Sequence, residues 1–384
     1  EYRVQNHRSG ILEKGSGVVS KKILILANHI DWVFSLRKEL IERFIKDYSV
    51  IISIPYKKTE KIEYFKNIGC EFKYVKYEAR STNIFKELDL IKEYKKIIKQ
   101  IKPDIILTYT IKPNIYGTYV AKKYKIPIIL NITGLGSGFN NNSIKHLVTN
   151  MYKYACKNAS FIFFQNEDNY RYFIDNKIAE KAKSKILPGS GVNLEKFKPT
   201  KKSKDDGITR FLFIGRIMKE KGIEEYLEAA KYISNKYSNV EFQILGPFEE
   251  EKYKEVIINL NNTKIKYLGK SDDVREEIKE VDCIINPTYH EGMSNVLLEG
   301  AAMGKPLIAT NIPGCREIVE DGANGYLFEP KNTQKLIEKI EQFLKLSPSE
   351  REKLGTAGRQ KVEENFDRNI VIKAYLETLR KILN

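Results

Sequence analysis

Short apolar runs alternate with longer amphipathic segments along this chain, and the alternation occurs twice. Runs without a polar residue at every second position are typical of strands buried on both faces of a parallel sheet. In the first half, we expect strands at Ile23–Ala27, Val50–Ile54, Asp104–Tyr109, Ile126–Ile132 and Ser160–Phe164, and helices near 33–45, 58–68, 84–101, 113–124 and 144–158. Repeated strand–helix–strand units predict an α/β fold with a doubly wound, mostly parallel sheet.

The alternation stops at a polar segment, Phe197–Gly207, and then starts again. The second set of expected strands is Arg210–Ile214, Val240–Leu245, Ile265–Leu268, Cys283–Asn286 and Leu307–Thr310, and helices are expected near 222–236, 250–260, 273–279, 294–303, 332–345, 350–363 and 368–383. Because 384 residues exceed the roughly 250–300 at which one core stops growing, we expect two domains. Ligands of such sheets bind outside the carboxyl ends of the strands, so a cleft between the domains is expected.

We predict a leader at 1–20, a Rossmann-like N-terminal domain at 21–200, a Rossmann-like C-terminal domain at 201–366, and a last helix at 367–384 that crosses back to the first domain. The leader lacks periodicity, an initiator Met and the apolar core of a signal peptide, so it is expected to be disordered or artificial in origin. The sequence contains no run of about 18 apolar residues, so no transmembrane helix is predicted. The four cysteines lie in or beside apolar stretches, which favours reduced core residues of a cytosolic protein.

The positive charge is unevenly distributed along the chain. The net charge is +16, and residues 1–200 hold 36 Lys and Arg against 19 Asp and Glu, a net of +17. Residues 201–384 hold 30 against 31, a net of −1. This asymmetry indicates an anionic partner for the first half, such as nucleic acid, a membrane face or a phosphorylated substrate. The alternative is a Lys-rich protein with ordinary solvated helix faces.

One candidate site lies in Asn286–Ala302, where an apolar strand leads through a loop into a helix. Gly292 permits close approach of the backbone, and the first amides of a helix have no internal partner, so an anion such as a diphosphate is favoured there. Glu291 and Glu299 suit the hydroxyls of a sugar better than its phosphates. The alternative is a capped amphipathic helix with two solvated glutamates.

A second candidate site lies in Phe213–Gly222, where a strand ends at Gly215 and a basic loop follows. Arg216 can bind phosphate oxygens with two parallel hydrogen bonds, and Lys221 can act as a point charge. Neither the dinucleotide pattern GxGxxG nor the P-loop pattern GxxxxGK[ST] occurs here.

Together, these segments resemble the family-4 glycosyltransferases of the GT-B fold, over nearly the whole chain from Lys21 onward. Glu291 and Glu299 have the spacing of the Glu-x7-Glu signature of that family, and Arg216 and Lys221 match its pair of donor-phosphate residues. Further matching segments are Pro188–Asn193, Gly314 in Pro-Gly-Cys-Arg-Glu, and Gly322–Phe328.

The resemblance implies a role for each matching residue. Arg216 and Lys221 would bind the donor diphosphate, Glu291 would hold hydroxyls of the donor sugar, and Glu299 would hold the ribose. The other implied donor-binding residues are Gly134, Gly136, Gly215, Gly292, Met293, Ser294 and Asn295, and 269–274 would border the base. The family retains the anomeric configuration, without a cofactor and usually without a metal, so we expect Asp272 and Asp273 to begin a helix instead. Ser294 stands where the family usually has Pro, which leaves the sugar selectivity open.

The first half resembles capsule and O-antigen transferases, which act on sugars linked to undecaprenyl diphosphate. The resemblance lies in Leu107–Gly117 and Asn131–Gly136. Gly134 and Gly136 would form a loop that faces the donor phosphates, or an ordinary turn. His29, Asp31 and Lys112 are the candidate acceptor residues.

The implied substrates are a nucleotide-sugar, with uridine as the preferred base, and an anionic lipid-linked saccharide. The implied location is the inner face of the cytoplasmic membrane. The helical segments 84–101 and 142–157 either contact the anionic leaflet there or are ordinary packed helices with one solvent-exposed face. The two glutamates are about two helical turns apart, too far for the two-carboxylate scheme of glycosidases. We therefore expect the departing phosphate to take the acceptor proton. The alternatives are a sugar-nucleotide epimerase of the same fold and, less well supported, a basic nucleic-acid-binding protein.

Overall fold

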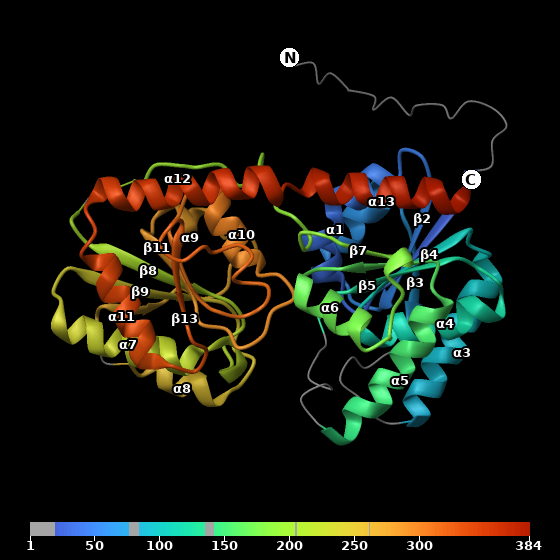
Figure 1. Cartoon of the computed structure of the whole chain (residues 1–384), viewed down its shortest axis with the longest axis horizontal. Helices are drawn as coiled ribbons and strands as arrows, with labels where there is room; N and C mark the ends of the chain where they lie inside the picture. The colour runs from blue at the N-terminus through green and yellow to red at the C-terminus, as the bar shows by residue number, and fades with distance from the viewer. Residues whose placement is uncertain (1–19, 77–83, 135–141, 204–205, 261) are drawn as a thin grey trace, which may run out of the picture.

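The computed structural model describes residues 20–76, 84–134, 142–203, 206–260 and 262–384, which form two α/β domains (Figure 1). The N-terminal domain holds a seven-stranded sheet with the order β3-β2-β1-β4-β5-β6-β7, in which every pair of neighbours is parallel. These strands are β1 (Lys22–Leu26), β2 (Ser49–Pro55), β3 (Glu71–Val75), β4 (Ile105–Tyr109), β5 (Ile128–Ile132), β6 (Phe161–Phe164) and β7 (Ser184–Ile186).

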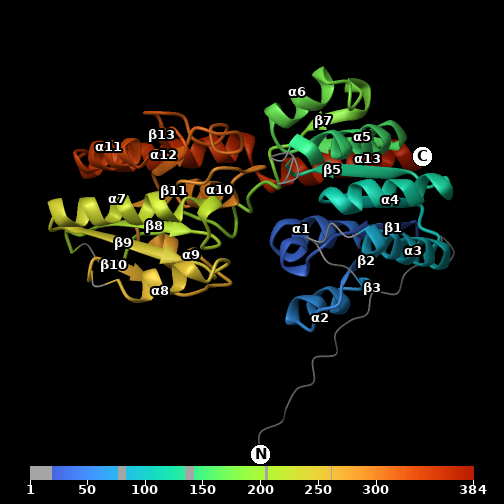
Figure 2. The same ribbon diagram turned by 90° about the horizontal axis from the view of Figure 1, so that it is seen from below.

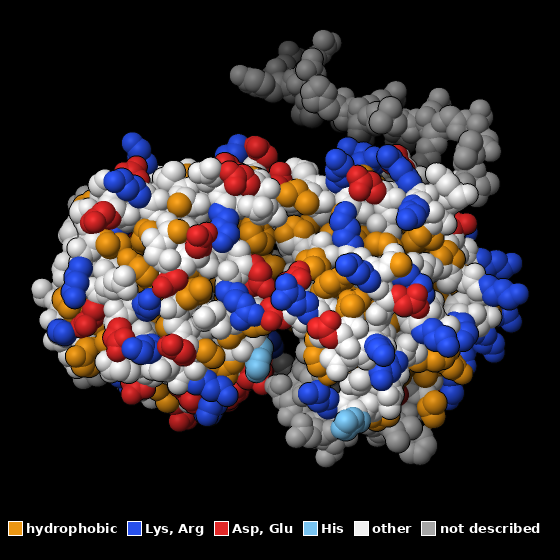
Figure 3. All heavy atoms as spheres, in the orientation of Figure 1, with side chains coloured by type: hydrophobic (Ala, Val, Ile, Leu, Met, Phe, Trp, Pro, Cys, Tyr) orange, Lys and Arg blue, Asp and Glu red, His pale blue; other side chains and the backbone are white. Residues whose placement is uncertain are grey.

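Helices cover both faces of this sheet (Figure 1). One face carries α3 (Ile84–Ile101), α4 (Ile111–Lys123), α5 (Asn142–Asn158) and α6 (Glu167–Asp175), and the other carries α1 (Ile30–Phe44), α2 (Glu60–Asn67) and α13 (Arg368–Leu383). Lys and Arg side chains gather over this domain, on the right of Figure 3. No helix in the described part of the chain is long and apolar enough to cross a bilayer.

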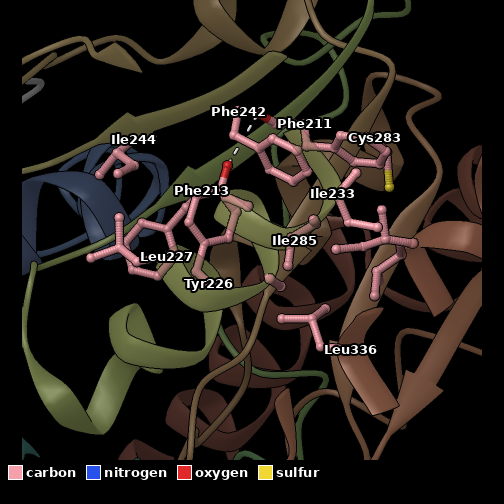
Figure 4. Close-up of a cluster of buried hydrophobic side chains, with 14 of the residues drawn as sticks. Phe211, Phe213, Tyr226, Leu227, Ile233, Phe242, Ile244, Cys283, Ile285 and Leu336 are labelled. Atoms are coloured by element: carbon pink, nitrogen blue, oxygen red, sulfur yellow. Dashed lines mark hydrogen bonds between the residues drawn. The ribbon is translucent and has the colours of Figure 1, made fainter. Parts of the chain in front are cut away.

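The C-terminal domain holds a six-stranded parallel sheet with the order β10-β9-β8-β11-β12-β13. Its strands are β8 (Thr209–Ile214), β9 (Val240–Leu245), β10 (Ile265–Tyr267), β11 (Cys283–Asn286), β12 (Leu307–Thr310) and β13 (Gly325–Phe328). Its helices are α7 (Ile223–Lys236), α8 (Lys252–Ile258), α9 (Arg275–Lys279), α10 (Asn295–Ala302), α11 (Thr333–Leu344) and α12 (Pro348–Asn365). Aromatic side chains fill the core on the α7 side, where the Tyr226 hydroxyl donates to the Phe211 carbonyl at 3.2 Å (Figure 4).

The predicted fold class is confirmed, but the strand prediction missed β3, β7 and β13. All three are edge strands, and an edge strand buries less of its surface than a central one. β3 alternates charged and apolar residues, β7 has three residues, and β13 begins with Gly325. A search for apolar runs therefore could not find β3 and β7, whereas β13 is apolar and mostly buried and was missed because it is short and follows the glycine-containing turn 322–324.

The chain crosses between the domains twice, and the two crossings lie side by side. The Val192 amide donates to the Phe366 carbonyl at 2.8 Å, and the Arg368 amide donates to the Val192 carbonyl at 3.0 Å. The Arg368 guanidinium donates to Glu39 of α1 at 2.5 Å. Val192 and Phe197 already lie in the core of the second domain, so the first crossing precedes most of the polar segment 197–207. The exact domain limits stay predictions.

Beyond the second crossing, α13 packs on the N-terminal domain as expected. Val371, Ala374 and Leu379 are buried against its core, and the Tyr375 ring lies 4.7 Å from Phe163 and 6.3 Å from Phe44, between centroids. The helix therefore supplies part of the core of a domain that is distant in sequence.

Candidate functional site

The loop after β8 brings a lysine to a glutamate of the loop after β11. Gly222 has a positive φ of 73°, and a Cβ built on it would lie 2.0 Å from the Pro287 carbonyl oxygen. The Tyr289 amide donates to the Glu220 carbonyl at 2.9 Å, which joins the two loops further. Lys221 Nζ consequently lies 2.5 Å from Glu291 Oε1.

This ion pair is the most enclosed charged contact among the predicted donor residues. Lys221 is 21% exposed and Glu291 is 18% exposed. Arg216, by contrast, is 38% exposed and lies 3.6 Å from Glu249 through its Nη1. A diphosphate that arrives here would compete for Lys221, and the released Glu291 carboxylate would then accept hydrogen bonds from hydroxyls. The ion pair between Lys221 and Glu291 can thus be replaced by two contacts with a phosphorylated sugar, one from Lys221 to a phosphate and one from Glu291 to a hydroxyl.

The N-terminus of α10 lies directly beyond this pair. Ser294 caps the helix, because its hydroxyl accepts from the Leu297 amide and from the Asn286 side chain at 2.6 Å. The Ser294 amide donates to the Gly314 carbonyl at 2.9 Å. The first helical amides, at Asn295 and Val296, have no intrahelical acceptor, and the helix dipole favours an anion before them.

Gly292 is the point where the second domain meets the first. A Cβ built on Gly292 would lie 1.8 Å from the Thr133 carbonyl oxygen, and the Asn166 side chain donates to the Gly292 carbonyl at 2.6 Å. Gly134 follows Thr133 directly and has open space around it, whereas Gly136 lies outside the described residues. Met293 is buried against Gly189. The structure therefore brings the predicted loop of the N-terminal domain to the predicted donor residues.

Glu299 lies on α10, one turn beyond Asn295, and is half-buried. Burial raises the pKa of Glu299 from its ordinary 4.5 to about 7, although the positive charges of Arg368 and Lys196 act in the opposite direction. Its carboxyl group makes no hydrogen bond to any described residue. A partly enclosed carboxyl group without a partner is suited to accept from a pair of ligand hydroxyls.

The N-terminal candidates Asp31 and His29 lie at the start of α1. Asp31 pairs with Lys57 at 2.8 Å and Lys61 at 2.7 Å, and Lys61 also lies 3.5 Å from Asp272 of the other domain. Burial raises the pKa of Asp31, but the hydrogen bonds from both lysines outweigh burial and lower it to about 2. Asp31 is thus a charged partner of lysines and not a proton acceptor near neutral pH.

His29 caps α1, and its Nδ1 accepts from the Asp31 amide at 3.2 Å. The pKa of His29 is lowered overall. Burial is the largest cause; the negative charge of Asp31 acts in the opposite direction, and the positive charges of Lys57 and Lys61 lower the pKa further. When Nδ1 accepts, the neutral ring carries its hydrogen on Nε2, which can donate to a ligand but cannot take its proton. Lys112 is in the first turn of α4 and pairs with Glu87 of α3 at 2.7 Å. Its acceptor role stays a prediction.

The sequence analysis missed the polar contacts that join the domains beside the site. Arg316 Nη2 lies 2.6 Å from Asp168 Oδ1 of α6, across the two domains. In the same loop of the C-terminal domain, the Gly314 amide donates to Glu317 at 2.7 Å. Burial raises the pKa of Glu317, whose Oε1 has no partner in the described part of the chain. Arg316 and Asp168 are 148 residues apart, and no local pattern links them.

Known proteins match the chain over both domains. A family model described as glycosyl transferases group 1 matches residues 195–361, and one described as glycosyl transferase 4-like matches residues 22–166. An uncharacterized glycosyltransferase of Methanocaldococcus jannaschii is 30% identical over 274 residues, which cover 69% of this chain and 72% of that protein. The chain belongs to this glycosyltransferase family. The predicted family resemblance is therefore confirmed.

Two relatives of this glycosyltransferase have names that specify a lipid-linked sugar as the acceptor. The N,N'-diacetylbacillosaminyl-diphospho-undecaprenol alpha-1,3-N-acetylgalactosaminyltransferase of Campylobacter jejuni is 26% identical over 91% of this chain and 96% of its own length. The UDP-Gal:alpha-D-GlcNAc-diphosphoundecaprenol alpha-1,3-galactosyltransferase of Escherichia coli is 28% identical over 65% of this chain and 69% of its own length.

The solved structure of Anabaena HepE with UDP and glucose matches the glycosyltransferase with a TM-score of 0.77 at 16% identity, over 94% of this chain and 99% of that chain. Sucrose-phosphate synthase from Thermosynechococcus elongatus matches with a TM-score of 0.79 at 15% identity, over the same shares. These matches show that the fold is GT-B.

Proposed function

We propose that this glycosyltransferase moves a hexose or N-acetylhexosamine from a UDP-sugar to a saccharide linked to a lipid diphosphate, with retention of the anomeric configuration. The relatives from C. jejuni and E. coli support the acceptor class, since both names specify a saccharide on diphospho-undecaprenol. The capsule enzyme of Staphylococcus aureus, 26% identical over 74% of this chain, supports a role in surface polysaccharide assembly.

The enclosed Lys221–Glu291 pair before the α10 N-terminus is the observation that carries the proposal. Lys221, Arg216 and the first amides of α10 stabilise the charge that develops on the leaving diphosphate. Glu291 holds sugar hydroxyls, Glu299 holds the ribose, and Gly134 borders the phosphates from the opposite domain. The donor needs no metal ion in this scheme, because protein groups supply the positive charge.

The acceptor proton passes to the departing phosphate oxygen, which is the group nearest to both reacting atoms. His29 Nε2 carries a hydrogen in its neutral form and Asp31 is held by two lysines, so neither is arranged as the base. Domain closure excludes water and so limits hydrolysis of the donor. The protein works at the inner face of the cytoplasmic membrane, where a basic N-terminal domain favours an anionic acceptor.

Nucleotide binding and acceptor-dependent turnover test this proposal. In a thermal-shift series with UDP, GDP, ADP and CDP at about 1 mM, we expect UDP to raise the melting temperature most. A ligand at a hundredfold excess over its Kd stabilises the fold by about 2.7 kcal/mol. UDP release from a UDP-sugar should then require a lipid-linked acceptor. Release of an epimerised sugar-nucleotide without acceptor, or binding of nucleic acid in place of nucleotides, would support the two alternatives instead.

UDP binding is expected to strengthen as the pH rises through about 7. The free carboxyl of Glu299 has a pKa of about 7, and the ribose hydroxyls favour its ionised form, so binding releases a proton. Between pH 7 and pH 6 the affinity should fall up to about tenfold by this linkage. The UDP phosphate titrates in the same range, so Glu299→Gln is the control: its pH profile contains the phosphate alone. Identical profiles for both proteins would refute the role of Glu299.

A further inference from the structure

An apolar groove lies on the surface of the N-terminal domain, where α4 packs between α3 and α5 (Figure 2). Its volume is about 370 Å³. Ile91 of α3, Ile115 and Tyr119 of α4, and Met151 and Tyr154 of α5 line most of it. None of these side chains belongs to the site described above, so the groove is a separate feature of the domain.

The three helices present apolar side chains on two sides. One side faces the sheet and is buried, as with Leu90 and Tyr152. Away from the sheet, large apolar side chains remain exposed to solvent: Leu88 at 48%, Tyr119 at 47%, Leu147 at 61% and Tyr154 at 38%. A surface helix of a globular protein needs only one apolar stripe. A second stripe that continues across three neighbouring helices indicates a binding surface.

The three helices that form the groove are strongly basic. The three helices together contain eleven Lys and three Asp or Glu, a net of +8. Lys95 Nζ lies 5.6 Å from the centroid of the Tyr119 ring, and Lys122 Nζ lies 5.2 Å from that of Tyr154. Lysines of this kind lay their apolar stems along an apolar surface and keep the ammonium group in water. The complementary ligand has an apolar body and an anionic group, as an anionic lipid does.

The groove also lies close to the cleft. α4 begins at Ile111, directly after the carboxyl end of β4, and Ile115 is about one helical turn, or 5–6 Å, further along. In a parallel sheet the carboxyl ends of all strands face the same side, which here is the side of Thr133 and Gly292. One elongated ligand can therefore place its charged end at the cleft and its apolar part in the groove.

We propose that this groove binds the isoprenoid chain of the lipid-diphosphate acceptor. This inference rests on the acceptor class given under Proposed function. The chain lies against Ile91, Ile115 and Met151, between the rings of Tyr119 and Tyr154 and their lysines. Chain binding positions the diphosphate and its saccharide toward the donor, independently of contact with a bilayer.

Calorimetry with geranylgeranyl diphosphate and with inorganic pyrophosphate tests the proposal without any turnover. The wild-type protein should bind the prenyl compound at least tenfold more tightly than pyrophosphate. The double variant Tyr119→Ser/Tyr154→Ser should lose about tenfold in affinity for the prenyl compound and keep its affinity for pyrophosphate. Both positions are exposed, so the fold should persist. Tyr232→Ser is the matched control, because Tyr232 is 49% exposed in the other domain and carries Lys236 Nζ 5.9 Å from its ring.

Three results would overturn the proposal. The first is that the wild-type protein binds both compounds with equal affinity. The second is that the double variant loses equal affinity for both compounds. The third is that the double variant binds the prenyl compound normally but no longer sediments with phosphatidylglycerol vesicles. The last result would assign the surface to the bilayer itself. A chain-length effect on the KM of the acceptor, lost in the double variant with unchanged donor KM, would support the groove. Absence of any nucleotide thermal shift would contradict the proposed function and leave the groove result standing.

Discussion

Replacement of Lys221 by alanine is expected to slow sugar transfer about hundredfold or more, the size of effect seen when one group that stabilises developing charge is removed. Lys221 is 21% exposed and lies 2.5 Å from Glu291. Its loss removes a positive charge from the site of the leaving diphosphate. It also leaves the Glu291 carboxylate unpaired beside the phosphates, which adds repulsion. The UDP thermal shift should therefore disappear in Lys221→Ala.

Two further variants separate these effects. Lys219→Ala is the matched control, since Lys219 lies on the same short turn, is 58% exposed and contacts Glu224 at 3.5 Å; its transfer rate should stay within twofold of wild type. Adding Glu291→Gln to Lys221→Ala removes the repulsion and should restore part of the nucleotide affinity, but not the transfer rate. Wild-type transfer in Lys221→Ala would refute the assignment of the donor site.

Replacement of Gly292 by alanine is expected to reduce transfer about hundredfold, because displacement of reacting groups by about 1 Å has an effect of this size. The added Cβ would lie 1.8 Å from the Thr133 carbonyl oxygen, so the two domains must move apart at the site. Each domain keeps its own core, and the melting temperature should change little. Transfer rates with saturating donor and acceptor measure the effect.

The control for Gly292→Ala is Gly358→Ala in α12. A Cβ at Gly358 meets no atom closer than 3.6 Å, which is ordinary contact, so alanine fits and transfer should remain normal. If Gly292→Ala transfers sugar at the wild-type rate, the contact with Thr133 does not persist in the state that reacts.

Much of the fold could be predicted because the central strands are buried on both faces and are mostly apolar. Val240–Leu245, Cys283–Asn286 and Leu307–Thr310 were placed with their correct bounds. The edge strands could not be found this way, since β3 and β7 carry polar residues toward solvent.

The donor-side residues were identified from two local segments, and the structure places Lys221, Glu291 and Gly292 together; their roles are still predictions. Contacts between the domains were beyond a local analysis. Asn166 and Gly292 are 126 residues apart, and Arg368 and Glu39 are 329 residues apart. Such pairs depend on how two folded domains meet. The pairing of Asp31 with Lys57 and Lys61, which changes the chemistry expected of a cleft carboxylate, likewise needs the tertiary structure.

The position of α13 has a consequence for the order in which the protein matures on the ribosome. The N-terminal domain is synthesised before the C-terminal domain, yet Val371, Tyr375 and Leu379, which cover one of its faces, are made after both. Until α13 has been synthesised, the side chains that meet it, such as Phe44 and Phe163, lack that partner. The N-terminal domain is thus completed only after the C-terminal domain has been synthesised, and a nascent chain that stops short of residue 368 leaves an apolar surface exposed to aggregation.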